Sequence, residues 1–414
     1  MEKLHFGVVG LGQRGHGLLK TVSMVKQAEI VAVCDLYQDR VEEGIRVVEK
    51  ERGNTPKGYL SFEEMLCDPS VDTVLIATPW DEHIRMAIES MKAHKITASE
   101  IGGAYDVEEC WELIRTYEET KTPIMFMENC CFDSFELLST TLARLDFLGD
   151  IVYCHGCYSH DLRDEVLGGN VNRHYRLKNY RKRNCENYPT HEIGPIAKLL
   201  DINRGNRFTK LVSYVSKAVG LESFETDERN PDKRLIGQRF AQGDIVTTMI
   251  QCANGEVVTI RLDTTLPKYY SREFMVRGTK GLCSQEGNMV LLDPKNNPHE
   301  FFSPELVYGK YLNNANDYHQ YLPELWKNIS PEEQAAGHGG MDYLMMKTFV
   351  ETALKGEELP IDVYDMATWA SISVLSEASI ALGGNSVVFP DFTKGKWISR
   401  ERKDVTPLID HILD

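Results

Sequence analysis

The residues most suggestive of chemistry lie at the start of the chain, where three glycines have the spacing of a phosphate-binding turn. An apolar run over 4–9 precedes them, and a helix-like stretch over 18–25 follows. In this context the first glycine of G-x-G-x-x-G permits a tight turn, the second lets the backbone approach a pyrophosphate, and the third allows close helix–strand packing. The helix N-terminus then offers N–H groups to the phosphates. The predicted cofactor-binding residues of this turn are Gly10, Gly12, Gln13, Arg14 and Gly15.

A carboxylate follows the next predicted strand at the distance that dinucleotide binding requires. The run 30–34 reads as that strand, and Asp35 ends it, 20 residues after Gly15. A carboxylate there can accept hydrogen bonds from the adenosine ribose and repels a 2′-phosphate, which favours NAD over NADP. The alternative role for Asp35 is a helix cap for the segment from Gln38. The turn and Asp35 together predict a Rossmann domain that binds NAD.

A second chemical group is the segment Tyr188-Pro189-Thr190-His191, which precedes a predicted helix over 195–202. A histidine near a helix N-terminus has its cationic form disfavoured, so it stays neutral near pH 7 and can accept a proton. The alternative is that His191 caps or packs against the helix and that Tyr188 belongs to the core. The residues alone favour this second interpretation.

Further candidates follow the ends of predicted parallel strands over 72–77, 95–99 and 123–127. Ligands of open α/β sheets sit at that carboxyl edge. The side chains nearest the last two strands are assigned to the nicotinamide side. The cofactor contacts predicted here are Trp80, His83, Glu100, Ile101 and Asn129.

The pair Cys154 and Cys157 matches C-x-x-C, with His160 nearby, and a zinc site is one interpretation. In a strand, positions 154 and 157 face opposite sides of the sheet, so they cannot share a tetrahedral metal. No second C-x-x-C is present, and we predict no metal. The same parity puts Tyr158 and His160 on one face.

The elements that position these groups change character near residue 129. Residues 1–128 alternate apolar strands with amphipathic helices, which indicates a parallel, doubly wound sheet of the α/β class. Residues 129–414 are predicted as an α+β substrate-binding domain with an open, mainly antiparallel sheet, and the final helices may return to the first domain. Its strands are predicted over 151–158, 211–216, 245–252, 257–263 and 272–277, its helices over 135–145, 341–354 and 366–381, and loops over 221–234 and 293–320.

Composition narrows the class of protein. The 414 residues exceed one compact core, and the formal net charge of −16, from 62 acidic and 46 basic residues, argues against a nucleic-acid partner. The apolar runs are too short to span a bilayer, and no charged-then-apolar leader is seen, so we predict no membrane partner and a cytoplasmic protein. The ten cysteines suggest reduced thiols rather than a disulfide framework.

A Rossmann half followed by an open antiparallel sheet resembles the Gfo/Idh/MocA oxidoreductases, and local motifs resemble glycoside hydrolase family 109 within them. The motifs are spread over both predicted domains. They are Gly10-Leu11-Gly12-Gln13-Arg14-Gly15, Met127-Glu128-Asn129-Cys130-Cys131, His160-Asp161-Leu162-Arg163, Tyr188-Pro189-Thr190-His191, Ile202-Asn203-Arg204-Gly205, Tyr270-Ser271-Arg272 and His338-Gly339-Gly340-Met341-Asp342.

The resemblance implies an NAD-dependent glycosidase acting on N-acetylgalactosaminides. The implied reaction oxidises sugar C3 transiently, removes the C2 proton, eliminates the glycosidic oxygen, adds water and returns the hydride. His191 is the implied base for the C3 hydroxyl, and Tyr158 or Tyr188 takes the C2 proton. The implied substrate contacts are Arg176, Pro189, Thr190 and Tyr270, and Asp161 with Arg163 is expected to form a supporting ion pair.

Two other functions stay open. A sugar or cyclitol dehydrogenase would accumulate NADH, but such enzymes carry Glu-Lys-Pro after this strand, whereas the chain has Glu100-Ile101-Gly102. A non-catalytic NAD-binding regulator would show no turnover. For Arg176, a surface position among basic neighbours is the competing interpretation. The resemblance also implies a homo-oligomer that forms through the second sheet.

Overall fold

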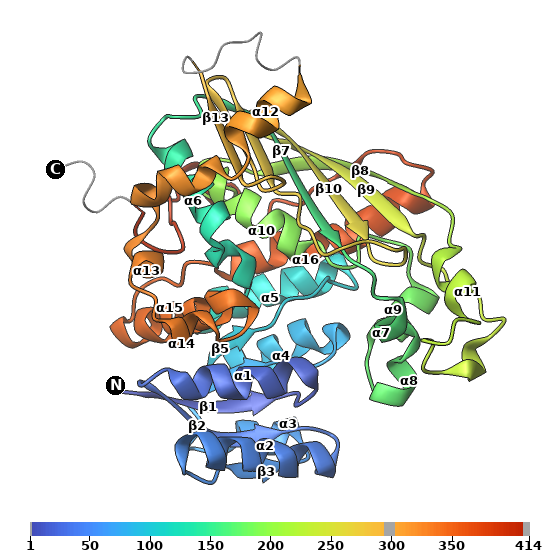
Figure 1. Cartoon of the computed structure of the whole chain (residues 1–414). Coiled ribbons are helices and arrows are strands. Elements are labelled where there is room, and N and C mark those ends of the chain that lie inside the picture. Colours follow the sequence, from blue (N-terminus) through green and yellow to red (C-terminus); the bar gives the residue numbers. More distant parts are fainter. Residues whose placement is uncertain (1, 294–302, 409–414) are drawn as a thin grey trace. The chain divides into compact units, whose positions relative to one another are not determined.

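The computed structural model of the chain describes residues 2–293 and 303–408 (Figure 1). The chain divides into two compact units. The first holds residues 1–132 and 329–371, and the second holds residues 133–328 and 372–414. Helix α16 (Val363–Ala381) supplies residues to both units.

The first unit is built on a six-stranded sheet of order β3-β2-β1-β4-β5-β6, in which all neighbours are parallel. The predicted doubly wound parallel sheet is therefore confirmed. The order reverses between β1 and β4, and ligands of such sheets bind at this switch point. The strands are β1 (Leu4–Val9), β2 (Ala28–Cys34), β3 (Lys57–Tyr59), β4 (Thr73–Ile76), β5 (Ile96–Ser99) and β6 (Ile124–Phe126).

Amphipathic helices pack around this sheet, and their ends follow local capping chemistry. Asp106 and Glu109 form a capping box at the start of α5, and Gly53 ends α2 in the left-handed conformation. The late helix α15 packs against α1 and the 3₁₀ helix η1, and Phe349 on α15 meets Phe6 of β1 edge to face. The helices are α1 (Gln13–Met24), α2 (Gln38–Arg52), α3 (Phe62–Leu66), α4 (Trp80–Lys92), α5 (Val107–Thr120), η1 (Asn129–Phe132), α14 (Pro331–Gln334), η5 (His338–Gly340) and α15 (Met341–Lys355).

The second unit has an eight-stranded sheet of order β13-β12-β11-β7-β10-β9-β8-β14. Neighbours are antiparallel except β7 and β10, so the predicted open, mainly antiparallel sheet is confirmed. Gly255 makes the β9–β10 turn with a φ of 105°. The strands are β7 (Ile151–Ser159), β8 (Phe208–Val215), β9 (Ile245–Cys252), β10 (Val257–Asp263), β11 (Met275–Gly278), β12 (Gly281–Ser284), β13 (Met289–Leu292) and β14 (Val387–Val388).

Helix α10 crosses strands β7 and β10 of this sheet and contacts α6 (Figure 1). Gly156 on β7 makes the close approach possible, because a Cβ there would lie 2.9 Å from the carbonyl oxygen of Glu192. The helices of this unit are α6 (Ser134–Arg144), α7 (Arg163–Leu167), α8 (Gly169–Asn172), α9 (Arg176–Lys182), α10 (Thr190–Leu199), α11 (Gly220–Phe224), η2 (Lys233–Leu235), α12 (Pro304–Tyr311), η4 (Asn314–Tyr321), α13 (Glu324–Lys327) and η6 (Lys396–Ile398).

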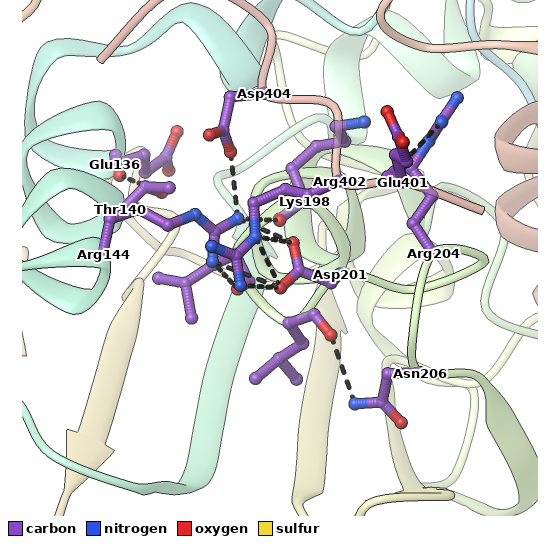
Figure 2. A network of polar contacts seen from close by, with 12 residues as sticks. Glu136, Thr140, Arg144, Lys198, Asp201, Arg204, Asn206, Glu401, Arg402 and Asp404 are labelled. Carbon is purple, nitrogen blue, oxygen red and sulfur yellow. Dashed lines mark hydrogen bonds and ion pairs between the residues drawn. The ribbon is translucent and has the colours of Figure 1, made fainter. Parts of the chain in front are cut away.

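A polar network centred on Arg144 joins α6, the end of α10 and the chain near residue 404 (Figure 2). Arg144 donates to the carbonyl oxygens of Lys198 and Leu199 and pairs with Asp201 and Asp404 at 2.8 and 2.9 Å. Its side chain is nearly buried, so the two carboxylates balance a charge that water cannot reach. The network fixes the end of the helix that begins beside His191.

Three local predictions were wrong. Helix α10 begins at Thr190, not near Pro195, because the proline is accommodated inside the helix. The predicted loop over 221–234 contains most of α11 and most of η2, and residues 304–320 of the other predicted loop are largely helical. Residues 294–302 of that loop lie outside the described part of the chain. In the described residues, no helix is long and apolar enough to cross a bilayer.

Candidate functional site

The glycine turn of the first unit has the shape of a phosphate cradle. Gly10 has a φ of 89°, and a Cβ there would lie 2.5 Å from the backbone of Ala77. A Cβ on Gly15 would lie 1.8 Å from the carbonyl oxygen of Gly10. Gly12 differs, since the nearest atom to its Cβ position, Nη1 of Arg40, is 3.7 Å away. Two glycines are thus required by packing, whereas the position of the third is open.

Asp35 directly follows β2, and its carboxylate binds the backbone of the glycine turn. Its carboxylate accepts hydrogen bonds from the N–H groups of Leu11 at 2.7 Å and Tyr37 at 3.0 Å. Arg40 approaches it at 3.7 Å. Tyr37 is the N-cap residue of α2, and no side chain caps this helix, so the alternative role of Asp35 as a helix cap was wrong. Gln13 is the exposed first residue of α1.

Arg14 belongs to a charged cluster at the carboxyl edge of the parallel sheet. Its guanidinium donates to both carboxylate oxygens of Asp342, at 2.6 and 3.0 Å, and to Glu100 at 2.7 Å. Asn129 donates to the same Asp342 at 2.8 Å, and a ring nitrogen of His338 lies 2.9 Å from it. Arg14 therefore organises the edge by linking the ends of β5 and α15 to the glycine turn.

Asp342 and His338 are the two members of this cluster that sequence reasoning missed, and Asp342 makes more of its contacts. Its side chain is buried, which by itself raises the pKa of the carboxyl. The hydrogen bond with His338 and the charge of Arg14 more than offset that effect, and the pKa lies well below its ordinary value. The available signal was its place in the His338-Gly339-Gly340-Met341-Asp342 motif, at the start of a helix.

The remaining predicted cofactor residues are packed after β4 and β5. A ring nitrogen of His83 lies 2.7 Å from the carbonyl oxygen of Thr78, and burial lowers the pKa of His83 to about 4. Trp80 begins α4 and contacts the backbone at Gly102, where a Cβ would lie 2.7 Å from the indole ring. Ile101 is buried next to that glycine. The structure thus places Trp80 against the loop that follows Glu100, while His83 contacts the backbone of Thr78 and Glu100.

The second unit brings a group of aromatic side chains together. The ring centroid of Tyr158 lies 4.6 Å from that of Tyr188 and 5.5 Å from that of His191. The rings of Tyr188 and His191 are 4.9 Å apart. Tyr270 is 6.4 Å from Tyr158 and 5.3 Å from His160. We call these five residues the aromatic cluster, and four of them were predicted as site residues.

His160 is the fifth member, which sequence reasoning placed only on the same strand face as Tyr158. Its ring nitrogen lies 2.9 Å from the Tyr158 hydroxyl. Burial, together with the charge of Arg176, lowers the pKa of His160 to about 4, so the ring is neutral at pH 7. Burial also raises the pKa of Tyr158 to about 12, so its hydroxyl keeps its proton. A protonated phenol and a neutral imidazole therefore share one hydrogen bond.

Arg176, the first residue of α9, brings the positive charge to this cluster. Its guanidinium carbon lies 5.1 Å from the centre of the Tyr188 ring, and its Nε lies 2.7 Å from Glu165. The residue is 7% exposed, so the competing prediction of a surface arginine was wrong. The expected ion pair of Asp161 and Arg163 is confirmed, with two hydrogen bonds of 2.7 and 2.8 Å.

The other predicted contacts differ in exposure. Pro189 precedes α10 and accepts the N–H groups of Glu192 and Ile193, while Thr190 is fully buried. His191 lies in the first turn of α10, where the helix dipole acts on it most strongly. Tyr270 is 49% exposed, and its hydroxyl accepts a hydrogen bond of 3.1 Å from Arg272. Tyr270 is therefore more accessible to a ligand than Thr190.

Comparison with known proteins covers both units. The family model described as "Glycosyl hydrolase 109, C-terminal domain" matches residues 133–399. The model "Oxidoreductase family, NAD-binding Rossmann fold" matches residues 4–127.

Individual relatives agree with these matches. An alpha-N-acetylgalactosaminidase of Tannerella forsythia is 36% identical over 96% of this chain and 88% of its own. A glycosyl hydrolase family 109 protein of Parabacteroides distasonis is also 36% identical, over 96% of this chain and 89% of its own. A solved levoglucosan dehydrogenase, in complex with NADH and levoglucosan, has the same fold with a TM-score of 0.70 at 18% identity, over 94% of this chain and 100% of its own. The chain therefore belongs to glycosyl hydrolase family 109.

Proposed function

We propose that this protein is an NAD-dependent glycosidase that acts on N-acetylgalactosaminides. The aromatic cluster carries the proposal, because it gathers tyrosines and two histidines beside an arginine in a family of glycosyl hydrolases. Ordinary glycosidases use two opposed carboxylates. Elimination next to a transient ketone needs a base at the C3 hydroxyl and another at C2, and this cluster offers such groups.

NAD, when bound, supplies a reversible hydride acceptor that makes the C2 proton acidic by oxidising C3. The glycine turn would hold its pyrophosphate, and Asp35 its adenosine ribose. Glu100, Ile101 and Asn129 would line the nicotinamide side, with Trp80 and His83 behind them. The space at Gly12 supports this assignment, because there the backbone is open to a phosphate.

We assign proton transfer at the C3 hydroxyl to His191. Tyr188, beside His191, is the candidate for the C2 proton. The high pKa of Tyr158 makes it a hydrogen-bond donor at neutral pH rather than a base, and His160 orients its hydroxyl. Arg176 and Tyr270 would bind sugar oxygens, and Pro189 and Thr190 would shape the turn between the two proton-transfer residues.

Incubation with a nitrophenyl N-acetyl-α-galactosaminide in deuterated water tests the reaction. Release of nitrophenol with deuterium at C2 and no net NADH is the expected result. Cleavage without deuterium at C2 would contradict the elimination. Accumulation of NADH would indicate a sugar or cyclitol dehydrogenase, and NAD binding without turnover would indicate a regulator.

We also propose that the second sheet forms a homo-oligomer contact. Tyr214 and Met249 lie on one face of neighbouring strands and are 64% and 50% exposed. Such apolar side chains on an open sheet favour association. The mass in solution of the wild type, compared with that of a Met249→Lys variant, tests this: an unchanged oligomer in the variant would exclude this face.

A further inference from the structure

Two buried carboxyl groups lie on either side of the segment that carries Tyr188 and His191. Glu186 is fully buried, and Glu192 is 1% exposed. Glutamate is almost never buried this deeply without a cationic partner. The two residues belong to the second unit, and neither is part of the aromatic cluster.

The two side chains contact each other, which requires a proton between them. Their carboxyl groups are hydrogen-bond partners, although two carboxylates offer only acceptors. The N–H of Tyr188 donates to Oε1 of Glu186 at 3.4 Å, and the N–H groups of Leu262 and Arg261 approach Glu186 and Glu192. Among the described residues, Oε2 of Glu186 and both oxygens of Glu192 find no donor in good geometry. One proton on the pair supplies the missing donor.

The pair is anchored on both sides. The N–H of Glu186 donates to Ser376 at 2.8 Å, and its carbonyl accepts from Ser373 at 2.6 Å, so α16 fixes the start of the segment. Glu192 lies in the first turn of α10, directly over Gly156 of β7. A hydrogen bond between the carboxyl groups therefore closes the loop formed by residues 187–191.

We propose that Glu186 and Glu192 share a proton and act as positioning residues that hold Tyr188 and His191 in their catalytic arrangement. The proposal rests on the proposed function for its catalytic half. It predicts that the loop loosens when the shared proton leaves, because two buried carboxylates in contact repel.

Among the groups in contact here, we expect the Glu186–Glu192 pair to titrate in mildly alkaline solution, because its titratable neighbours have higher pKa values. Burial raises the pKa of Glu186 to about 8, and burial with the charge of Glu186 also raises the pKa of Glu192 well above its ordinary value. Glu192 faces Cys157 of β7, whose pKa burial raises to about 11, and the backbone N–H of Arg261 on β10. Glu186 faces Tyr180 and Cys185, whose pKa values burial also raises.

Glu192→Gln and Glu186→Gln test the proposal, because glutamine keeps a hydrogen bond but cannot lose a proton. The pH profile of kcat/KM in the wild type should fall on the alkaline side, and each variant should shift that fall upward by about one pH unit or more. Glu225→Gln is the matched control, since Glu225 is a buried carboxyl that accepts from Gly237 elsewhere in the unit. Its profile should follow the wild type.

Two readouts test the pair without relying on glycosidase activity. The infrared difference spectrum between pH 7 and pH 10 should show a protonated carboxyl band in the wild type that the Glu186→Gln/Glu192→Gln double variant lacks. Hydrogen exchange of residues 187–193, corrected for the intrinsic pH effect, should rise above about pH 8 in the wild type and not in Glu192→Gln. Absence of the band, or exchange that rises equally in both proteins, would overturn the proposal even if the enzyme proves active. If the protein shows no glycosidase activity, the proposed function is contradicted. The infrared and hydrogen-exchange results would then still decide whether Glu186 and Glu192 share a proton.

Discussion

Burial affects the protonation of side chains differently in the charged cluster around Arg14 and in the aromatic cluster. In the first unit, Arg14 lies between Asp342 and Glu100, and the positive charge keeps the pKa of Asp342 low. In the second unit, burial acts with less compensation, so Tyr158 keeps its proton and His160 stays neutral. The first arrangement suits a site that holds a charged ligand. The second suits a site that moves protons, because its tyrosine carries a proton that it can donate and its neutral histidine can accept one.

Replacing His191 should cause the largest loss of activity, and it should affect the aromatic cluster of the second unit without affecting NAD binding. His191→Ala should lower kcat/KM by about 10²–10⁴-fold, the usual contribution of a general base. NAD affinity should stay near the wild-type value, because the glycine turn belongs to the other unit. Steady-state kinetics and a fluorescence titration with NADH check both parts. Activity within a fewfold of the wild type would remove His191 from the mechanism.

Replacing Asp342 should affect the first region in turn. Asp342→Asn leaves Arg14 with only Glu100 as a charged partner and should destabilise the protein by about 1–3 kcal/mol, less than a fully buried pair because Arg14 is partly exposed. NAD affinity should fall about tenfold as the edge loosens. Thermal unfolding and NADH titration measure the two effects. An unchanged affinity would show that the cluster serves stability alone.

Gly156→Ala should disturb the aromatic cluster through the backbone. The new Cβ would meet the carbonyl oxygen of Glu192 at 2.9 Å, so α10 must shift, at a cost of about 1–3 kcal/mol. We expect kcat/KM to fall about tenfold, since small displacements of catalytic groups are costly. Gly17→Ala is the control: a Cβ there meets nothing within 4 Å, and stability should rise by about 0.5–1 kcal/mol.

The pH dependence of the free energy of unfolding should show the smallest difference between the two units, through Asp342 in the first and Glu186 in the second. Asp342 has a lowered pKa, so its stabilising effect is present above the unfolded value near 4 and is lost as the pH falls. Glu186 has a raised pKa, so its folded state binds more protons, and stability should decline as the pH rises from about 4 to about 8. Thermal unfolding from pH 3 to pH 9 should show Asp342→Asn flattening the acid limb and Glu186→Gln flattening the neutral one. The reverse assignment would contradict the comparison.

The parts of the fold that sequence predicted well are those with a clear hydrophobic period. Strands β9 and β10 alternate buried and less buried residues, and their predicted bounds agree with the structure. Helix α10 was misplaced because Pro195 reads as a helix start, whereas the structure places it inside the helix. The short strand β3 has no apolar run to reveal it.

The site was predictable where a local motif carries the chemistry. Tyr158 lies on β7 and Tyr188 and His191 share the motif before and at the start of α10, and the structure places the three rings side by side. Asp342 lies 328 positions from Arg14, so only tertiary structure reveals their contact. Glu186 and Glu192 could not be found from sequence, because a glutamate on a helix or loop normally faces water.

The central claim is that the aromatic cluster removes the C2 proton of the sugar during a reaction that leaves the cofactor unchanged. The most direct measurement is the deuterium content at C2 of the released sugar after turnover in deuterated water, followed together with NADH absorbance. We expect deuterium at C2 and no net NADH in the wild type, and strongly reduced formation of the labelled product with His191→Ala. Hydrolysis that leaves C2 unlabelled, or NADH that accumulates in proportion to product, would contradict it.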